Sequence, residues 1–437
     1  MSGRIKQLCK YLKENCKVAK DLTLLKDDRV KPNYSTQMMV MSCLLSFICR
    51  TRSTRQLCRR LKKKGWRRFL GIDLSKSTPV EGTFRNFYPK LHTISIRKAM
   101  ISSVKRMRIS KMHQRRQFDG LHVVSIDGTQ PFSTHHFNCT GCIKHKSRRS
   151  NAEKDDPPAS WYDHRIVTAR LIGDSFSPWL GFISQKPKTD KGGYEGEQTA
   201  VPRLLTQLEE DYGRNTIDVI LTDALHVTNS FIQECERHGW WATFISKKNA
   251  SSLKKGFEYK PLGEPVVVTK KIHEGVVEAT IWRQENIYLS TCSLPLQVLK
   301  IHQVVKNMAG KILREDIRWI GSRIPVGRLS AEKLWWMGWR RWESENGGHR
   351  NFKRDHHAKH IFCHGNSIAV ENIFWMLMWS QNLLEAFGLR RLQSGRFGGL
   401  RSGLIGLVEE IVEGLAANPS SQLFFNKELR VTLWHGG

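Results

Sequence analysis

The sequence predicts an α/β fold: a mixed sheet with flanking helices, a β-rich insertion, and a basic helical region ahead of the sheet. Three observations support this class. Short β-branched runs alternate with segments of helical periodicity between residues 117 and 250. Strand-like runs separated by turn residues follow between 251 and 325. Residues 1–116 are rich in lysine and arginine, and their apolar residues recur at helical spacings. Strands and helices that alternate in this way build a sheet covered by helices.

The composition limits the class of partner. The chain has 437 residues, a formal net charge of +31 and a pI near 10.0. Such a charge favours a long polyanion, and nucleic acid is the usual one. Ribosome-associated and membrane-surface proteins are also basic, but no lipidation motif or basic amphipathic helix of the membrane type stands out.

The sequence also predicts a compartment. The apolar run from Met38 to Cys49 is shorter than the roughly 20 residues that a bilayer span needs. The first residues lack the apolar core of a signal peptide. Ten cysteines in so long a chain form no dense disulfide framework. We therefore expect a reduced, cytoplasmic protein that does not act on membranes.

Residues 1–116 are expected to form a helical, basic, DNA-binding domain. Ser53 stands at an N-cap position, and Gly65 is expected to stop the helix that begins there. A second helix is expected after Thr83. Basic helices joined by a turn can enter a DNA groove, and a solvated basic face on a helical bundle explains the same pattern equally well.

Residues 117–250 are expected to form the first part of the core. A β-branched run ending at Asp127, followed by Gly128, predicts a strand and then a turn. The uniformly apolar run before Asp223 predicts a strand in the middle of a sheet. In chain order we expect strands at 122–127, 165–172, 179–183, 217–221 and 241–245, the second and third of them a hairpin, with helices at 199–212 and 229–238.

The rest of the chain is expected to hold three parts. Residues 251–325 form the β-rich insertion, with strand-like runs at 265–271, 275–282 and 287–290. Residues 326–389 complete the core, with a helix that Ser330 caps and a long apolar helix at 368–389. Residues 390–437 form a basic, glycine-rich tail and a final helix.

Three acidic residues stand out in this basic chain. Asp127 and Asp223 each end an apolar run, and Glu345 follows a tryptophan-rich helical stretch. Two aspartates at strand ends and a helical glutamate suit a site for two Mg²⁺ or Mn²⁺ ions. Oxygen ligands suit these ions, and rigid elements hold them about 3.5–4 Å apart across an in-line phosphoryl transfer. The alternative for each is a turn or cap residue, and for Asp127 considered alone that alternative is the better one.

These segments resemble the insertion-sequence DDE transposases of the cut-and-paste type, over most of the chain. The resemblance rests on three motifs at spacings of about one hundred residues: Ser125-Ile-Asp-Gly-Thr-Gln130, Leu221-Thr-Asp-Ala-Leu-His226 and Arg341-Trp-Glu-Ser-Glu-Asn346. It implies a ribonuclease-H-like core with a β-rich insertion before the catalytic glutamate. It also implies that the two aspartates and the glutamate are catalytic and hold two Mg²⁺ or Mn²⁺ ions. The implied partner is double-stranded DNA, bound by a homodimer at the nucleoid of a bacterium.

The position of the glutamate departs in part from the family's pattern, Tyr-x2-Arg-x3-Glu-x6-Lys. Arg341 and Glu345 fill the arginine and glutamate positions. Gly338 stands in the tyrosine position, and Phe352 stands in the lysine position with Lys353 one residue late. These departures are also compatible with a transposase-derived chain that has lost its catalytic activity.

Glu343 competes with Glu345 for the role of catalytic carboxylate. At 100° per residue, Trp335, Trp339 and Trp342 fall on one helical stripe, with Glu345 beside it. We expect that stripe to pack on the sheet and to hold Glu345 at the edge of the sheet. The tryptophans are then core residues and do not stack on bases.

Four cations and one aromatic residue are the candidates for DNA contacts. Arg341, one helical turn before the glutamate, contacts a phosphate, orients the carboxylate or forms a plain intrahelical ion pair. Lys247, Lys248 and Lys353 meet phosphates or are solvated surface lysines. Trp282 stacks on a flipped base or, as is commoner for such a residue, packs within its strand.

Cys139 and Cys142 form the one Cys-x2-Cys pair of the sequence. Tetrahedral zinc needs further ligands, and four histidines lie between residues 135 and 164. One pair with scattered histidines is a weak zinc signal, so the sequence alone does not decide whether zinc binds.

The leading interpretation is a DNA transposase. It binds terminal inverted repeats, cleaves DNA by two-metal phosphoryl transfer and joins 3′ ends to target DNA. One alternative is a transposase-derived DNA-binding protein that no longer cuts, against which the intact acidic triad argues. Another is a metal-dependent DNA nuclease without strand transfer, which uses the same carboxylates. The sequence leaves open the inverted repeat, the target preference and the route of excision.

Overall fold

The computed structural model describes residues 2–108, 118–136, 139–147, 159–173, 176–187, 194–246, 251–258, 263–272, 274–289, 292–360, 362–363, 365–392 and 400–417. Within these ranges ten strands form one mixed sheet. They are β1 Val123–Thr134, β2 Ile143–Ser147, β3 Ala159–Ile172, β4 Trp179–Ser184, β5 Val219–Asp223, β6 Trp241–Ser246, β7 Val266–Ile272, β8 Gly275–Leu289, β9 Cys292–Lys306 and β10 Ile312–Ser322.

The strand order is β2-β3-β1-β5-β6-β10-β9-β8-β7, with β4 also paired to β3. β1 pairs antiparallel with β3 and parallel with β5, and β5 pairs parallel with β6. β3 and β4 form the expected hairpin, and β5 lies in the middle of the sheet as its apolar sequence predicts. The prediction of an α/β protein with a mixed sheet is therefore confirmed.

The expected turn after Asp127 is wrong. β1 continues to Thr134, and Gly128 pairs with Val167 of β3 in regular register. The irregularity comes later, as a register shift between Thr129 and Phe132. An Asp-Gly pair predicts a turn because glycine permits one, but glycine is also compatible with extended backbone when both neighbouring strands offer partners.

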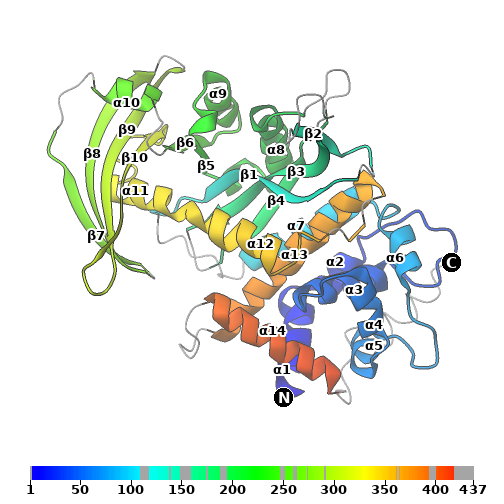
Figure 1. Cartoon of the computed structure of the whole chain (residues 1–437). Coiled ribbons are helices and arrows are strands. Elements are labelled where there is room, and N and C mark those ends of the chain that lie inside the picture. The colour runs from blue at the N-terminus through cyan, green and yellow to red at the C-terminus, as the bar shows by residue number, and fades with distance from the viewer. Residues whose placement is uncertain are drawn as a thin grey trace.

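The β-rich region after residue 262 is not a separate insertion in the sheet order. β10 pairs antiparallel with β6, so β7–β10 continue the central sheet, at the left in Figure 1. The expected strand at 287–290 belongs to the end of β8, and β9 and β10 were not expected at all. Three consecutive charged residues, Arg314, Glu315 and Asp316, lie in the mostly exposed first half of β10, so its sequence resembles a solvated segment.

Fourteen α-helices accompany the described sheet. They are α1 Ser2–Lys10, α2 Val18–Leu22, α3 Thr36–Ile48, α4 Thr54–Leu61, α5 Lys64–Leu70, α6 Glu81–Phe87, α7 Thr93–Met107, α8 Glu197–Tyr212, α9 Asn229–Arg237, α10 Ser251–Glu258, α11 Ala331–Arg340, α12 Arg350–Arg354, α13 Ser367–Leu392 and α14 Leu400–Ala416. Short helical segments of other types are η1 Tyr11–Asn15, η3 Arg214–Thr216, η4 Ala224–His226 and η5 Glu343–His349.

The two faces of the sheet belong to two apolar clusters. Val124 and Ile220 pack in one cluster with α8, α9 and α13, whereas Val123 and Leu221 pack in the other with α11. Successive residues alternate between faces because the side-chain period of a strand is two. α8 and α9 accordingly lie together above the sheet in Figure 1, while α11 crosses on the other side.

The N-terminal helices are held to the sheet region by α13. α13 packs against α3 and α7, and α14 packs against α1 and α5 (Figure 1). α3 is buried along almost all of its residues, which explains why its sequence is apolar without a helical stripe. None of the helices in the described part of the chain has the length and apolarity needed to cross a bilayer.

Two capping predictions in the helices are confirmed, and one stop signal is wrong. The side chain of Ser53 accepts a hydrogen bond from Gln56 N, and that of Ser330 accepts one from Lys333 N. Gly65 does not stop a helix but lies in α5. A Cβ at Gly65 would lie 1.8 Å from the carbonyl oxygen of Leu415, so glycine is required there by the close approach of α14.

Candidate active site and nucleic-acid interface

The parallel pairing of β1 and β5 brings Asp127 and Asp223 to the same level of the sheet. Val123 is paired with Val219, and Ser125 is paired with Leu221. Asp127 and Asp223 each lie two residues further on, so their side chains follow the same face as the paired residues. The two aspartates predicted from separate strand ends thus share one edge of the fold.

Asp223 also has a local role. Its carboxylate accepts a hydrogen bond of 3.0 Å from Leu225 N and so caps η4. Burial lowers the pKa of the neighbouring His226, while the charges of Asp223 and Asp127 act in the opposite direction. The cap that was the alternative for an aspartate in this position is therefore present, beside a second carboxylate and a buried imidazole.

Glu197 is a third carboxylate at the same place, and it was not predicted from the sequence. It begins α8, and a Cβ at Gly128 would lie 2.0 Å from Glu197 Oε1. Burial raises the pKa of Glu197, and the charges of Asp127 and Asp223 raise it further. An acidic residue in the first turn of a helix is ordinary, so only the tertiary structure reveals that this one joins the aspartates.

Glu345 lies in the π-helical segment η5, immediately after α11. Arg341 donates a hydrogen bond of 2.5 Å to Glu345 Oε1, so the intrahelical ion pair is present. Arg341 Nη1 also lies 3.9 Å from Asp127 Oδ2. Arg341 therefore lies between the carboxylates of β1 and η5. The side chain of Glu343 lies outside the described residues.

His349, at the end of η5, is a further neighbour of Asp127. Its Nδ1 lies 3.4 Å from Asp127 Oδ2, and its Nε2 lies 2.8 Å from Thr168 Oγ1. Its ring stacks on Trp179 with 5.5 Å between centroids. The hydroxyl of Thr168 in turn donates to the carbonyl oxygen of Asp127 at 3.1 Å. His349 lies three residues after the Arg341–Asn346 motif, but no spacing rule assigns it a role.

One glycine, Gly348, lets η5 approach the sheet. A Cβ at Gly348 would lie 2.6 Å from Arg170 Nη1 and 2.9 Å from the ring of Trp179, whereas one at Gly347 would meet Arg170 Nη1 at an ordinary 3.5 Å. Arg170 is itself held by Glu385 of α13, with 3.0 Å between Nη2 and Oε2, in a buried ion pair. The sheet, α13 and η5 are thereby joined at Gly348.

Two of the three tryptophans in the predicted stripe, Trp335 and Trp339, pack on the sheet as predicted. Trp335 is 1% exposed in the second apolar cluster, and Trp339 packs at the margin of that cluster. The guanidinium of Arg318 lies 6.0 Å from the ring of Trp339 and 5.6 Å from that of Trp342. These contacts hold α11 on the sheet and fix where η5 begins.

The acidic cluster consists of Asp127, Asp223, Glu197 and Glu345, with Arg341 among them. It offers oxygen ligands on two strands and two helical segments, which is the donor set that Mg²⁺ and Mn²⁺ prefer. The carboxylate oxygens of this cluster lie further apart than the ligand atoms of a site that holds an ion. Of the residues described, the one group of three potential ligands whose atoms all lie within 4.8 Å is a different one, formed by two cysteines and a histidine.

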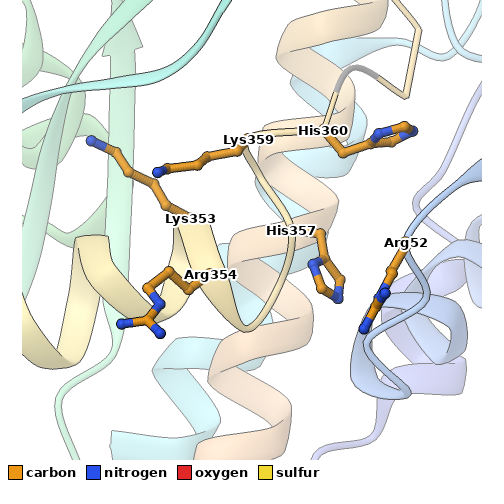
Figure 2. Close-up of a pocket in the computed structure, with 6 residues that line it drawn as sticks. All are labelled: Arg52, Lys353, Arg354, His357, Lys359 and His360. Atoms are coloured by element: carbon orange, nitrogen blue, oxygen red, sulfur yellow. The ribbon is translucent and has the colours of Figure 1, made fainter.

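A second feature is a hollow of about 500 Å³ lined by cationic and imidazole side chains. Figure 2 shows Arg52, which reaches in from the segment between α3 and α4, opposite residues of α12 and the segment after it. The lining residues are Arg52, Lys353, Arg354, His357, Lys359 and His360. None of the described residues that line the hollow is acidic, so these side chains form an anion-attracting surface.

The crowding of cations affects their protonation. Burial lowers the pKa of Lys353, the charge of Lys359 lowers it further, and Asp127 acts in the opposite direction. Burial and then the charge of Arg52 lower the pKa of His357. Lys353 is thus within electrostatic reach of both the hollow and the acidic cluster.

Trp282, another candidate for DNA contact, is not brought to this place. Trp282 packs partly against the core on β8, with Lys300 Nζ 5.3 Å from its ring centroid. β8 is five strands from β1 in the sheet, a separation of about 24 Å. Lys247 and Lys248 lie outside the described residues.

The protein is thus a mixed α/β protein with an acidic cluster at the sheet and a basic hollow next to it. Residues 6–90 match a protein family described as a transposase domain (DUF772). This match covers the N-terminal helices, supports a transposase, and suggests a transposition-related function and a DNA-processing enzyme. None of the curated proteins compared with the chain matches it.

Proposed function

We propose that this protein is a cut-and-paste DNA transposase of the DDE type. It binds the terminal inverted repeats of its element, cleaves DNA by two-metal phosphoryl transfer and joins the 3′ ends to target DNA. We further propose that it acts as a homodimer on double-stranded DNA, at the nucleoid in the bacterial cytoplasm. The observation that carries the proposal is the shared level of Asp127 and Asp223 on adjacent parallel strands, with Arg341 between Asp127 and Glu345.

The order of the central strands supports a ribonuclease-H-like core. β4, β3 and β1 form an antiparallel meander, and β5 and β6 continue the sheet parallel to β1. The acidic cluster lies at the carboxyl end of β5, where open α/β sheets place their sites. The transposase-domain match in residues 6–90 supports a transposase from an independent part of the chain.

The chemistry assigned to the cluster follows from its ligands. Asp127, Asp223 and Glu345 would hold two divalent ions, and Glu197 lies close enough to add negative charge. When bound, such ions activate the attacking water or 3′-hydroxyl and stabilise the leaving oxygen. Arg341 keeps Glu345 in place before DNA binds and offers a guanidinium to a phosphate afterwards. His349 orients Asp127 through its bond to Thr168.

The hollow lined by Lys353 and Arg52 is the proposed phosphate track. It contains only basic side chains, and Lys353 links it to the acidic cluster. A DNA backbone placed there would relieve the repulsion among these cations and lead a strand toward Asp127. Basic residues of this kind set affinity and position, not sequence preference.

The test is cleavage of labelled DNA that carries the element's own ends, with Mg²⁺. Asp127→Ala, Asp223→Ala and Glu345→Ala are each expected to bind the ends but to lose at least about 10²-fold in cleavage. Glu258→Ala, an exposed carboxylate on α10, and Glu343→Ala are expected to cut normally. Wild-type protein that binds and never cuts would support the inactive DNA-binding alternative.

A second assay separates a transposase from a nuclease. With pre-cut ends and a supercoiled target plasmid, a transposase joins the 3′ ends to the target. A nuclease cuts the uncut substrate and leaves the target unjoined. Normal cleavage by Glu345→Ala together with loss by Glu343→Ala would move the catalytic glutamate two residues back.

A further inference from the structure

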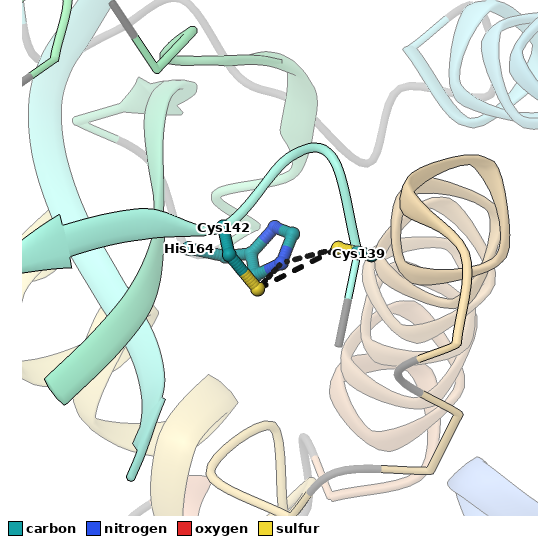
Figure 3. A group of neighbouring side chains, drawn as sticks. All are labelled: Cys139, Cys142 and His164. Carbon is teal, nitrogen blue, oxygen red and sulfur yellow. Dashed lines mark hydrogen bonds between the residues drawn. The ribbon is translucent and has the colours of Figure 1, made fainter. Parts of the chain in front are cut away.

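Two cysteines and a histidine converge at a place that the proposed function does not use. Cys139 and Cys142 lie in the turn between β1 and β2, and His164 lies in β3 (Figure 3). The three side chains come from segments separated by more than twenty residues and all are buried, at 6%, 4% and 7% exposure. Buried polar groups from different segments that meet in this way need a common partner or mutual bonds.

The spacing of their atoms fits a tetrahedral ion. Cys139 Sγ lies 3.7 Å from Cys142 Sγ, and His164 Nε2 lies 3.2 and 3.8 Å from the two sulfurs. Zinc bonds of about 2.3 Å to sulfur and 2.0–2.1 Å to nitrogen place ligand atoms about 3.8 Å apart for S···S and about 3.5–3.6 Å for S···N. The sulfurs are too far apart for a disulfide, which needs about 2.05 Å.

The local backbone also suits a metal site. Cys142 N donates to the carbonyl oxygen of Cys139 at 3.1 Å, which closes a tight turn and turns both thiols to the same side. A Cβ at Gly141 would lie 3.1 Å from His164 Cε1, so the imidazole packs directly against this turn. The ring of His164 packs on Phe132 of β1, with 5.3 Å between centroids, which fixes its orientation.

We propose that Cys139, Cys142 and His164 bind a zinc ion, with the fourth position filled by water or a further side chain. Thiolate and imidazole ligands in tetrahedral arrangement favour zinc over magnesium and calcium. This site is separate from the acidic cluster in its ligands and its chemistry, and it does not depend on the proposed function.

The position of the site indicates a structural role. Thr140 Oγ1 lies 3.5 Å from Ser367 Oγ at the start of α13, and Phe132 packs on Phe374 of the same helix. An ion bound to the turn and to β3 would join the end of β1, the edge of the sheet and the start of α13. β1 also carries Asp127, so the ion would stabilise the strand on which the acidic cluster is built.

The first test is the metal content of the purified full-length protein, measured by inductively coupled plasma mass spectrometry. We expect about one zinc ion per chain in wild type and loss of nearly all of it in Cys139→Ser, Cys142→Ser and His164→Ala. Cys58→Ser removes another buried thiol, in α4, and is expected to keep the zinc. Asp127→Asn is expected to keep it as well, which assigns the ion to this site and not to the acidic cluster.

A second measurement on wild-type protein guards against variants that fail to fold. After removal of zinc by a chelator, Co²⁺ is expected to produce a thiolate-to-cobalt charge-transfer absorption. Zn²⁺ is expected to raise the Tm, and the increase should grow with the free Zn²⁺ concentration. Wild-type protein that purifies without zinc, shows no charge-transfer absorption with Co²⁺ and keeps the same Tm in Zn²⁺ would overturn the proposal. Zinc that is lost in Asp127→Asn and kept in Cys139→Ser would also overturn it.

Discussion

Glu197 lies so close to Gly128 that its carboxylate occupies the space a side-chain carbon would need. The glycine therefore admits a carboxylate from the start of α8 beside the strand that carries Asp127. Burial and the two aspartates raise the pKa of Glu197, and the charge of Arg165 acts in the opposite direction. The raised pKa is the expected effect of burying a carboxylate next to other negative charges.

Glu197→Gln removes one negative charge from the acidic cluster while keeping its shape. We expect this variant to need about 10-fold more Mg²⁺ for half-maximal DNA cleavage, because groups next to a metal site tune its affinity. The measurement is cleavage rate against Mg²⁺ concentration. Glu210→Gln, an exposed change on the same helix, is the control, and equal Mg²⁺ requirements for both variants would remove Glu197 from the site.

Gly348→Ala tests how closely η5 packs against the sheet. The added methyl group would lie 2.6 Å from Arg170 Nη1 and 2.9 Å from Trp179, so η5 must shift away from the sheet. A shift of about 1 Å at a catalytic group costs on the order of 10²-fold in rate. We expect that loss in cleavage with DNA binding retained. Gly347→Ala makes an ordinary 3.5 Å contact and is the matched control; equal losses in both variants would contradict the explanation.

Lys353→Ala tests the phosphate track. We expect weaker DNA binding, by a similar factor for all sequences, and a slope of log affinity against log salt that is smaller by about 1. Affinity measured by fluorescence anisotropy at several salt concentrations gives that slope. Lys254→Ala removes an exposed lysine on α10 and is expected to leave it unchanged. A sequence-dependent loss in Lys353→Ala would instead indicate base contact.

Gly65→Ala and Gly82→Ala form a matched pair for stability. A Cβ at Gly65 would lie 1.8 Å from the carbonyl oxygen of Leu415, whereas a Cβ at Gly82 meets nothing within 4 Å. We expect Gly65→Ala to destabilise the protein by about 1–3 kcal/mol through overpacking. Gly82→Ala is expected to stabilise it by about 0.4–1 kcal/mol. Urea unfolding measures both, and a neutral Gly65→Ala would show that α5 and α14 do not pack this closely.

His356 is expected to make the protein sensitive to acid. Burial lowers its pKa to about 3, and the charge of Arg50 adds to this. In the unfolded chain this histidine takes up a proton near pH 6.5, whereas in the folded chain it stays neutral until the pH approaches its lowered pKa. The free energy of unfolding is therefore greatest above pH 6.5 and falls as the pH drops toward the folded pKa. We expect a loss of about 2 kcal/mol between pH 6.5 and 5.

The comparison for that prediction is His356→Gln. Urea unfolding at pH 7.5 and 5 should show a smaller pH dependence in this variant than in wild type. His135→Gln, at an exposed histidine, should keep the wild-type dependence. An unchanged pH dependence in His356→Gln would mean that His356 is solvated in the folded protein.

The sequence predicted those elements whose hydrophobic pattern is strong. β5, β6, α8, α9 and α13 lie close to where their apolar periodicity placed them, because burial itself produces that periodicity. β10 was missed because its first half is exposed, and β1 was cut short because Asp-Gly favours a turn only when no strand partner is near.

The candidate site shows the same division. Asp127 and Asp223 were found because each follows a buried strand, and parallel pairing then placed them together. Glu197 and His349 reach Asp127 from α8 and η5 through tertiary packing, and a single sequence carries no local pattern for such contacts. The zinc ligands combine both cases, with a recognisable cysteine pair and a histidine that only the β1–β3 pairing selects.

The common register of β1 and β5 also determines which length changes the protein can tolerate. A residue added or removed between Val123 and Asp127 would turn the carboxylate to the opposite face, because side chains alternate along a strand. Residues added in the segment between α8 and β5 would leave both aspartates where they are. Among natural variants of this chain, we therefore expect gaps in alignment to cluster in that connection and to be absent from the four-residue step that leads to Asp127.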